Sequence, residues 1–330
     1  MSKTFAVIGL GSIAERHRRN IRLLWPDSKI YAVSSSGRIP GETPANCDEL
    51  LTGIEDLITR SIDVAIIASP APFHARHAIE LIQAGIHTLI EKPLCTSPED
   101  ATAILQSAAK PHSNVAVGYC LRFLPSALLM KTLIAERRAG QVFNVSIEVG
   151  QYLPDWRPNK LYTDTVSARA ELGGGALFEL SHEFDYCQWI FGELSLKHAC
   201  LRSSEQLNLD VEDIADVVAM LPDGALVNIH LDFLQKRPYR HCRVVGSEGV
   251  LNWDLITNTV SFSNSDGDET IYSEALWDKN QMYTDMLAEF VSGGVQEPDS
   301  TLCTLTQALN TVHFINDIKS SSNVNRNKHK

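Results

Sequence analysis

The sequence predicts an α/β fold of two domains, and three observations support this prediction. The chain has 330 residues, more than a single hydrophobic core usually serves. Up to about residue 120, short apolar segments alternate with helical segments, which is the pattern of a parallel sheet covered on both faces. Beyond Tyr119, strand-like segments follow one another with few helices between them. We therefore expect one domain over residues 1–120. Over residues 121–330 we expect an α+β domain with a large, mostly antiparallel open sheet.

The first domain is predicted from short segments rich in aliphatic and β-branched residues, which are typical of buried strands. The expected strands are Phe5–Ile8, Lys29–Val33, Val64–Ala68, His87–Ile90 and Asn114–Gly118. Helices are expected between them, where the segments are longer. They run from about Ile13 to Leu24, from Phe73 to Ala84 and from Pro98 to Ala109.

The second domain opens with an expected helix from Pro125 to Glu136. Strands are expected at Val142–Val149, Leu196–Arg202, Ala215–Leu221, Ala225–Leu234, Arg243–Val245 and Val250–Trp253. The turn signal Pro222–Gly224 joins two of them as a hairpin. Further helices, predicted to pack on one face of the sheet, are Gly175–Phe191, Lys279–Val291 and Leu302–Ile318. Residues 318–330 are polar and basic, which predicts a flexible tail.

The composition argues against several classes of protein. A formal net charge of −11 does not suit a nucleic-acid surface, which is built from Lys and Arg. No apolar stretch is long enough to span a bilayer, and the chain runs directly into a predicted strand rather than a signal peptide. The seven cysteines form no Cys-x-x-Cys pair, so we expect reduced thiols, a cytoplasmic protein and no metal site.

A glycine-rich motif lies between the first predicted strand and the first predicted helix. It reads Gly-Leu-Gly-Ser-Ile-Ala over residues 9–14. Gly9 permits a tight turn, Gly11 lets the backbone approach a pyrophosphate, and Ala14 allows close packing of helix on strand. The free N–H groups of the helix N-terminus would then hold the pyrophosphate. The motif predicts a Rossmann dinucleotide-binding domain, with cofactor contacts at Gly9, Gly11, Ser12 and Ile13.

The end of the second predicted strand bears on the choice of cofactor. A site that prefers NAD places an acidic residue on the ribose hydroxyls, about twenty residues beyond the glycine motif. Here the strand is followed by Ser34, Ser35 and Ser36, and then by Arg38, with no carboxylate. Hydroxyls and a guanidinium suit the 2′-phosphate of NADP. We therefore expect NADP, in contact with Ser34, Ser35 and Arg38, although Arg38 pointing into water is the alternative.

Several further motifs follow in a fixed order, and together they resemble the glucose-fructose oxidoreductase, inositol dehydrogenase and rhizopine-catabolism (Gfo/Idh/MocA) family. The resemblance covers nearly the whole chain and rests on Gly9–Ala14, Ala68–His74, Glu91–Pro93, Gly118–Phe123 and Gly173–Asp185. It implies a Rossmann domain followed by an open-sheet domain. It also implies oxidation or reduction of a carbinol carbon in a sugar, polyol or sugar nucleotide. Residues 152–158 are similar to the branch associated with bacterial surface-sugar metabolism.

The resemblance assigns the catalytic residues. Lys92 matches the family's active-site lysine, whose bond to Pro93 is often cis in relatives. His182 matches the histidine that serves as general acid and base. Relatives place an aspartate four or, in some branches, three residues before this histidine. Here Phe178 takes the former position and Glu179 the latter, so Glu179 would orient His182 or relay its proton. These residue types suit the chemistry, since histidine titrates near neutral pH and an ammonium stabilises a developing alkoxide.

The resemblance also places residues around cofactor and substrate. It implies cofactor contacts at Ser69, Pro70, His74, Glu91 and Lys92. Ser69 replaces a frequent threonine and Ala71 a frequent asparagine, which would reduce side-chain contacts near the nicotinamide. Expected substrate contacts are Tyr119, Arg122, Trp156, Arg157 and Tyr162. Trp156 and Arg157 suit a sugar ring and an anionic phosphate. Packing within a loop is the alternative for these two, and pairing with an acid is the alternative for Arg122.

The function expected from these residues is an NAD(P)-dependent dehydrogenase or reductase of a sugar, sugar nucleotide or polyol. Two alternatives stay open: a redox-neutral NAD-dependent glycosidase, and a non-catalytic regulator that senses a dinucleotide on the same fold. A homo-oligomer, dimer or tetramer, is expected because exposed faces of large open sheets often pair. His17, within the basic run Arg16–Arg19, is predicted to lie on a solvated helix face near the pyrophosphate.

Overall fold

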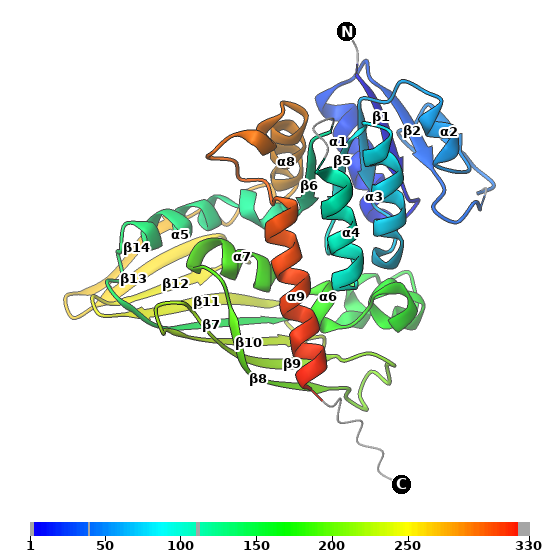
Figure 1. The fold of residues 1–330 in the computed structure, drawn as a ribbon. Helices are drawn as coiled ribbons and strands as arrows, with labels where there is room; N and C mark the ends of the chain where they lie inside the picture. Colours follow the sequence, from blue (N-terminus) through cyan, green and yellow to red (C-terminus); the bar gives the residue numbers. More distant parts are fainter. Residues whose placement is uncertain (1–2, 39, 110–112, 323–330) are drawn as a thin grey trace. The chain divides into compact units, whose positions relative to one another are not determined.

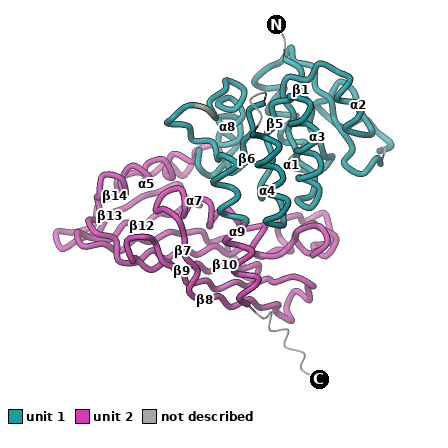
Figure 2. The backbone as a smooth tube through the Cα atoms, in the orientation of Figure 1, with its two compact units in different colours: residues 1–123, 279–312 teal, residues 124–278, 313–330 magenta. Residues whose placement is uncertain are grey.

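The computed structural model describes residues 3–38, 40–109 and 113–322, and the chain divides into two compact units (Figure 2). Unit 1 comprises residues 1–123 and 279–312, and unit 2 comprises residues 124–278 and 313–330. The predicted division after residue 120 treated each domain as one continuous stretch. Residues 279–312 group instead with unit 1, because Cys303 forms a β-bridge with Val117 and a helix of this segment packs on the first helix of the chain.

Unit 1 is built on a six-stranded parallel sheet, sheet A (Figure 1). Its strand order is β3-β2-β1-β4-β5-β6. The strands are β1 (Thr4–Ile8), β2 (Lys29–Val33), β3 (Glu49–Leu51), β4 (Val64–Ile67), β5 (His87–Glu91) and β6 (Val115–Gly118). The helices are α1 (Ser12–Leu24), α2 (Glu55–Ile58), α3 (His74–Gln83), α4 (Pro98–Ala108) and α8 (Gln281–Val291). The order reverses between β1 and β4, and ligands of such sheets bind outside the carboxyl ends of the strands at that point.

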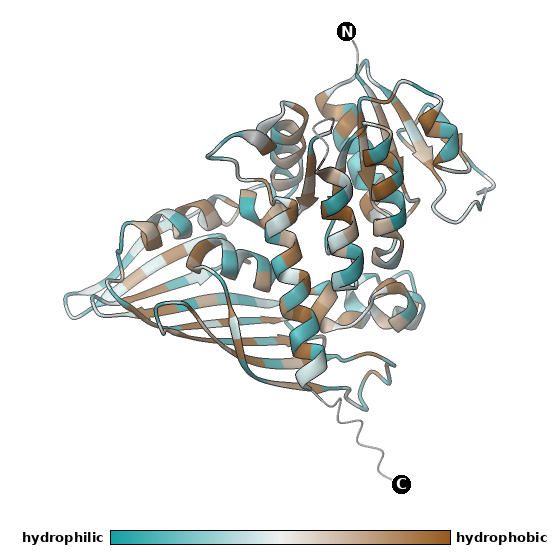
Figure 3. Cartoon of the chain, in the orientation of Figure 1, coloured by the Kyte–Doolittle hydropathy of each residue, from teal (hydrophilic) through white to brown (hydrophobic). Residues whose placement is uncertain are grey.

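The strands of sheet A are buried on both faces, which explains their nearly continuous apolar sequence. In β1, Ala6 and Ile8 belong to the core that includes the apolar side chains of α3. The alternate residue Phe5 stacks on Trp25, at the end of α1, with 5.1 Å between the ring centroids. Figure 3 shows these strands in the colours of apolar residues. The expected strands and helices of this half are therefore present, and the prediction omitted only the short elements β3 and α2.

Unit 2 is built on an eight-stranded sheet, sheet B, of order β14-β13-β12-β11-β7-β10-β9-β8 (Figure 1). All neighbouring strands are antiparallel except β7 and β10, which pair in parallel. The strands are β7 (Val142–Gly150), β8 (Ser195–Arg202), β9 (Ile214–Met220), β10 (Leu226–Asp232), β11 (Tyr239–Gly246), β12 (Val250–Asp254), β13 (Thr259–Asn264) and β14 (Gly267–Ser273). The helices are α5 (Pro125–Ala135), α6 (Ala176–Glu179), α7 (His182–Phe191) and α9 (Leu305–Ser321), of which α9 begins in unit 1.

One face of sheet B is buried and the other is half exposed. Along β10, Val227, Ile229 and Leu231 are buried, whereas Leu226 before them and Asn228 between the first two are exposed. This alternation, which Figure 3 shows as changing colours along the strands, is typical of an antiparallel sheet covered on one side. Helix α6 contacts β9 and β10, and α5 contacts β13 and α7, so these helices cover the buried face.

Several predicted boundaries in this half were wrong. The single helix expected over Gly175–Phe191 is two helices, α6 and α7, separated by Leu180 and Ser181. Strands β13 and β14 were missed; β14, at the sheet edge, has no buried side chain and hence no apolar pattern. The flexible tail predicted from residue 318 begins too early, since α9 continues to Ser321 and buries Ile318. Residues 323–330 of that tail lie outside the described part of the chain.

Within the described residues, no helix is long and apolar enough to cross a membrane. All seven cysteines lie in the described part, and none of them forms a disulfide.

The half-exposed face of sheet B carries a row of acids and histidines from neighbouring strands. His230 of β10 lies between Asp216 of β9 and Glu148 of β7 in the strand register. Its Nδ1 lies 2.6 Å from Asp216 Oδ1, and its Nε2 lies 3.1 Å from Asp232 Oδ2. The hydrogen bond to Asp232, opposed by partial burial and supported by Asp216, raises the pKa of His230 to about 9.

The wild type is therefore expected to lose part of its free energy of unfolding at alkaline pH, whereas the variant His230→Gln, which lacks this imidazole, should not show that loss. Because the folded-state pKa of His230 lies above its unfolded value near 6.5, this stabilisation is complete below pH 6.5 and is lost as the pH rises through 9. The difference in melting temperature between the wild type and His230→Gln should be largest near pH 6 and small above pH 9.5. A difference that stays constant across this range would contradict the assignment.

Candidate functional site

The glycine motif forms an open cradle between β1 and α1. Gly9 has φ +119°, and a Cβ at this position would lie 2.4 Å from the carbonyl oxygen of Ala68. The fold itself therefore requires glycine at this position. Gly11 is different, because its φ is −78° and a Cβ there would meet nothing within 4 Å. The space beside Gly11, at the start of α1, suits the approach of a pyrophosphate, so the residues present fit a dinucleotide.

The two glycines give a matched pair of variants. Gly11→Val should leave the melting temperature nearly unchanged and weaken NADPH binding by at least about tenfold, equivalent to about 1.4 kcal/mol. Gly9→Ala should instead lower the free energy of unfolding by about 1–3 kcal/mol, since it forces a side chain onto positive φ and a carbonyl. Thermal melts and NADPH fluorescence titrations of both variants check this. Unchanged NADPH affinity in Gly11→Val would place the cofactor elsewhere.

A cavity of about 450 Å³ lies at the carboxyl end of β2. Its lining residues come from the segments after β2 and β3, from the first residue of α2, and from α3 with the residue before it: Ser34, Ser35, Ser36, Gly37, Thr52, Gly53, Ile54, Glu55, Phe73, Arg76, His77 and Glu80. Arg38 is exposed and is not among them. The guanidinium in this cavity belongs to Arg76, which the sequence analysis missed because a charged residue on an amphipathic helix gives no separate signal.

His74 links the segments that follow β4 and β5. Its Nε2 lies 2.8 Å from the carbonyl oxygen of Ser69, and its Nδ1 lies 3.0 Å from that of Pro93. The side chain is buried, and burial lowers the pKa of His74 against the opposing effect of the two carbonyls. Both ring nitrogens of His74 thus contact backbone carbonyl oxygens of the protein. His74 positions the segment that carries Lys92, and Ser69 and Pro70 begin the loop that it holds.

Lys92 directly follows β5, and its neighbour Glu91 is held by α1. Glu91 Oε1 lies 2.6 Å from His17 Nε2, and its Oε2 accepts a hydrogen bond of 3.2 Å from the backbone N–H of Lys92. The Lys92–Pro93 peptide bond is cis. The prediction for His17 was wrong: this residue is fully buried rather than solvated, on the face of α1 that also buries Ala14 and Ile21.

In unit 2, the triple glycine before α6 is required by the fold. Gly173 and Gly175 have positive φ of 78° and 102°. A Cβ on Gly174 would lie 2.5 Å from the carbonyl oxygen of Val166. The segment leads into α6, whose first N–H groups bind Glu212: Ala176 N donates to its backbone oxygen at 2.9 Å and Leu177 N to its Oε1 at 3.2 Å. Burial raises the pKa of the Glu212 carboxyl, a residue that the sequence analysis also missed.

His182 is the first residue of α7, and Glu179 is the last residue of α6. Both are partly buried. The next residue, Glu183, is fully buried and forms a two-fold ion pair with Arg240 of β11, at 2.7 Å to Nε and 2.9 Å to Nη2. This pair fixes the start of α7 against sheet B and so positions His182. The catalytic roles of Lys92, His182 and Glu179 stay predictions.

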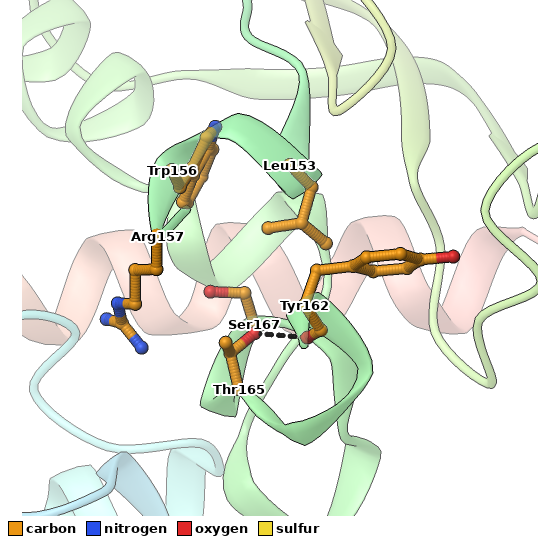
Figure 4. A pocket seen from close by; sticks show the side chains of 6 residues that line it. All are labelled: Leu153, Trp156, Arg157, Tyr162, Thr165 and Ser167. Carbon is orange, nitrogen blue, oxygen red and sulfur yellow. Dashed lines mark hydrogen bonds between the residues drawn. The ribbon is translucent and has the colours of Figure 1, made fainter. Parts of the chain in front are cut away.

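Three of the predicted substrate residues lie together in unit 2 (Figure 4). They line one hollow over the short 3₁₀ turns η3 (Leu153–Trp156), η4 (Tyr162–Asp164) and η5 (Val166–Ala168), and its lining residues are Leu153, Trp156, Arg157, Tyr162, Thr165 and Ser167. Trp156 Nε1 donates to the carbonyl oxygen of Gln151 at 3.3 Å, and Tyr162 Oη donates to that of Leu207 at 3.1 Å. These bonds hold the loop together, whereas Arg157 is exposed.

The other two predicted substrate residues are buried in unit 1. Tyr119 directly precedes the 3₁₀ turn η2 (Cys120–Phe123), and Arg122 lies within it. Arg122 Nη1 donates to Gln307 Oε1 at 2.8 Å. Arg122 therefore binds a side chain amide within its own unit, and its contact with substrate stays a prediction. In the described part of the chain, no group of three His, Cys, Asp or Glu side chains is arranged to hold a metal ion.

Comparison with known proteins identifies two matched regions. Residues 3–119 match a family model described as oxidoreductase family, NAD-binding Rossmann fold, and residues 127–252 match the Gfo/Idh/MocA C-terminal domain. Glucose-6-phosphate 3-dehydrogenase of Bacillus subtilis (strain 168) is 24% identical over 243 residues, which are 69% of this chain and 67% of that protein. Inositol 2-dehydrogenase of Corynebacterium glutamicum (strain R) is 26% identical over 255 residues, 70% and 68% of the two chains.

Solved structures share the fold over nearly the whole chain. A complex of levoglucosan dehydrogenase with NADH and levoglucosan has a TM-score of 0.81 at 19% identity and covers 97% of both chains. The WlbA dehydrogenase of Bordetella pertussis, in complex with NADH and UDP-GlcNAcA, has a TM-score of 0.80 at 18% identity and covers 97% of this chain and 96% of that one. At these identities, the similarity establishes the two-domain architecture.

Proposed function

The chain belongs to the Gfo/Idh/MocA family of NAD-binding oxidoreductases that act on CH–OH groups, and we propose that it uses NADP to oxidise or reduce a carbinol carbon of a sugar or sugar nucleotide. One observation carries the proposal: Lys92 stands at the carboxyl end of β5, fixed through the buried Glu91–His17 pair, in the same unit as the open cradle at Gly11. Carbinol oxidation requires a bound nicotinamide and a group that stabilises negative charge on the oxygen, such as an ammonium.

The residues divide the work as follows. The nicotinamide, when bound, accepts or supplies the hydride. The Lys92 ammonium stabilises negative charge on the substrate oxygen, and the His182 imidazole takes the proton from that oxygen or returns it. Glu179 orients His182 from the preceding helix.

The preference for NADP is supported by the segment after β2. Ser34, Ser35 and Ser36 all line the 450 Å³ cavity there, and no acidic residue occupies the strand end. Together with these hydroxyls, the guanidinium of Arg76 in the same cavity supplies donors and a positive charge that suit a phosphate.

A sugar or sugar nucleotide is supported by three side chains of unit 2 and by the relatives. Trp156, Arg157 and Tyr162 offer aromatic surfaces and an exposed guanidinium. Rings of this kind stack on sugars, and a guanidinium binds phosphate. The named relatives include dehydrogenases of glucose 6-phosphate and inositol and a structure with UDP-GlcNAcA. We propose that the substrate belongs to bacterial surface-sugar metabolism.

We also propose a cytoplasmic homo-oligomer, dimer or tetramer. The seven free thiols support a reducing compartment. The half-exposed face of sheet B, with Leu226 45% and Tyr239 39% exposed, supports an interface between copies. Light scattering during gel filtration measures the mass of the assembly, and a monomer would exclude it.

The test of the proposed function is nicotinamide absorbance against time, with NADP and then NAD, over a panel of nucleotide sugars, free sugars and polyols. A change in absorbance with one substrate, faster with NADP, is expected. Sugar release without net change in absorbance would establish the redox-neutral reaction instead. A flat trace with all compounds, despite NADPH binding, would favour a sensor.

A further inference from the structure

The cavity at the end of β2 holds a single permanent cation. Among its twelve lining residues, all of which the structure describes, Arg76 is the one lysine or arginine. Two carboxylates, Glu55 and Glu80, also line it. His77, the remaining ionisable group, adds no charge at neutral pH, because burial and then the Arg76 charge lower its pKa to about 4. The charge offered to a ligand is therefore set by Arg76 against two acids.

Arg76 is held in place by its neighbours on α3 and before it. Its Nη2 donates to His77 Nε2 at 3.1 Å, and its guanidinium lies 6.0 Å from the ring centroid of Phe73. Because arginine only donates hydrogen bonds, Nε2 of His77 must accept, and the proton of the neutral ring must sit on Nδ1. That nitrogen lies 3.1 Å from Ser69 Oγ, so the ring donates to Ser69. One guanidinium N–H is used in this way, which leaves the opposite edge of the fork for a ligand.

The serines on the other side of the cavity complete a set of donors for an anion. Ser34, Ser35 and Ser36 follow β2, where a bound dinucleotide places its adenosine ribose. Serine hydroxyls alone cannot decide between a ribose hydroxyl and a phosphate, since they donate and accept equally well. Glu55 and Glu80 would repel a phosphate and accept from a free ribose hydroxyl. The choice between the two cofactors therefore depends on whether a guanidinium outweighs these acids.

We propose that Arg76 is the residue that determines specificity for the phosphorylated cofactor, its guanidinium pairing with the 2′-phosphate of NADP inside this cavity. The sequence analysis assigned this part to Arg38, which lies outside the lining of the cavity, whereas Arg76 is part of it. The inference rests on the proposed function in that it takes NADP as the cofactor. It goes further by naming Arg76 on α3, with Glu80 one helical turn away, as the pair that sets the preference.

The test compares two fragments of the cofactor, adenosine 2′,5′-bisphosphate and 5′-AMP, which differ only in the 2′-phosphate. Titration calorimetry on the full chain should show the bisphosphate binding more tightly to the wild type. Arg76→Ala should weaken bisphosphate binding by about 10- to 100-fold, the usual effect of losing charge-assisted hydrogen bonds, and leave 5′-AMP binding within about twofold. Arg76→Lys should recover part of the loss, and Arg38→Ala should change neither ligand.

Glu80→Gln is a second variant that keeps the proposal testable if Arg76→Ala folds poorly. Removing this carboxylate should strengthen bisphosphate binding and should not strengthen 5′-AMP binding, because the free 2′-hydroxyl of 5′-AMP loses an acceptor. Equal binding of both fragments by the wild type would refute the NADP preference and this inference together. A wild type that prefers the bisphosphate, combined with an unaltered preference in Arg76→Ala or a lost preference in Arg38→Ala, would overturn the role of Arg76 alone.

Discussion

Lys92→Ala is expected to lower kcat by about 100- to 1,000-fold, the usual loss when one preorganised donor to a developing oxyanion is removed. The reason is local: Lys92 follows β5 in a segment held by Glu91, His17 and His74, and alanine at this position offers no cation in place of the ammonium group. NADPH binding should persist, because the cradle at Gly11 comes from a different loop. The measurements are kcat at saturating sugar substrate and the Kd of NADPH by fluorescence.

A lysine at the opposite end of the same sheet provides the control. Lys29 begins β2 at its amino end, with half of its side chain exposed, and Lys29→Ala should keep kcat within about twofold because the effect of an exposed charge is small. Turnover by Lys92→Ala equal to that of the wild type would remove Lys92 from the mechanism. Loss of NADPH binding together with turnover would instead assign Lys92 to the cofactor site.

The architecture could be predicted from sequence wherever burial leaves a pattern. The strands of sheet A are buried on both faces, so β1 and β4 appear as unbroken apolar segments. The glycine motif marks the turn between β1 and α1, where the cradle lies. Strand β14 has no buried side chain and hence no such pattern, which is why it was missed. The grouping of residues 279–312 with unit 1 depends on a β-bridge between Val117 and Cys303, and no local property of either segment encodes it.

The candidate site was predicted where a motif carries it and missed where tertiary contacts do. Gly9, Gly11 and Lys92 stand in motifs with a mechanical reason for each residue. His17 was misplaced because its neighbours in sequence are arginines, although its own side chain turns inward to Glu91. Arg76 stands two residues from His74 on α3, and only the folded chain brings it to the cavity at the end of β2. From sequence alone, a charged residue on a helix surface that only contacts water cannot be distinguished from one that binds a cofactor.

Glu183→Ala is expected to lower the free energy of unfolding by about 3–5 kcal/mol, because it removes the buried carboxylate of an ion pair together with both of its hydrogen bonds. Glu183 is fully buried, and both of its carboxylate oxygens accept hydrogen bonds from Arg240. Urea unfolding followed by circular dichroism measures the change. Since α7 begins at His182, the variant should also lower kcat in whatever fraction remains folded.

A surface ion pair of the same unit is the matched control. Arg138 and Glu269 lie 2.7 Å apart with side chains 44% and 60% exposed, so Glu269→Ala should cost less than about 1 kcal/mol. The double variant Glu183→Leu with Arg240→Met removes both charges and should recover most of the stability that Glu183→Ala loses. If it does while kcat stays low, the ion pair serves chiefly to position His182, because its net contribution to folding would then be small. If Glu183→Ala costs no more than Glu269→Ala, the pair does not fix α7 to sheet B.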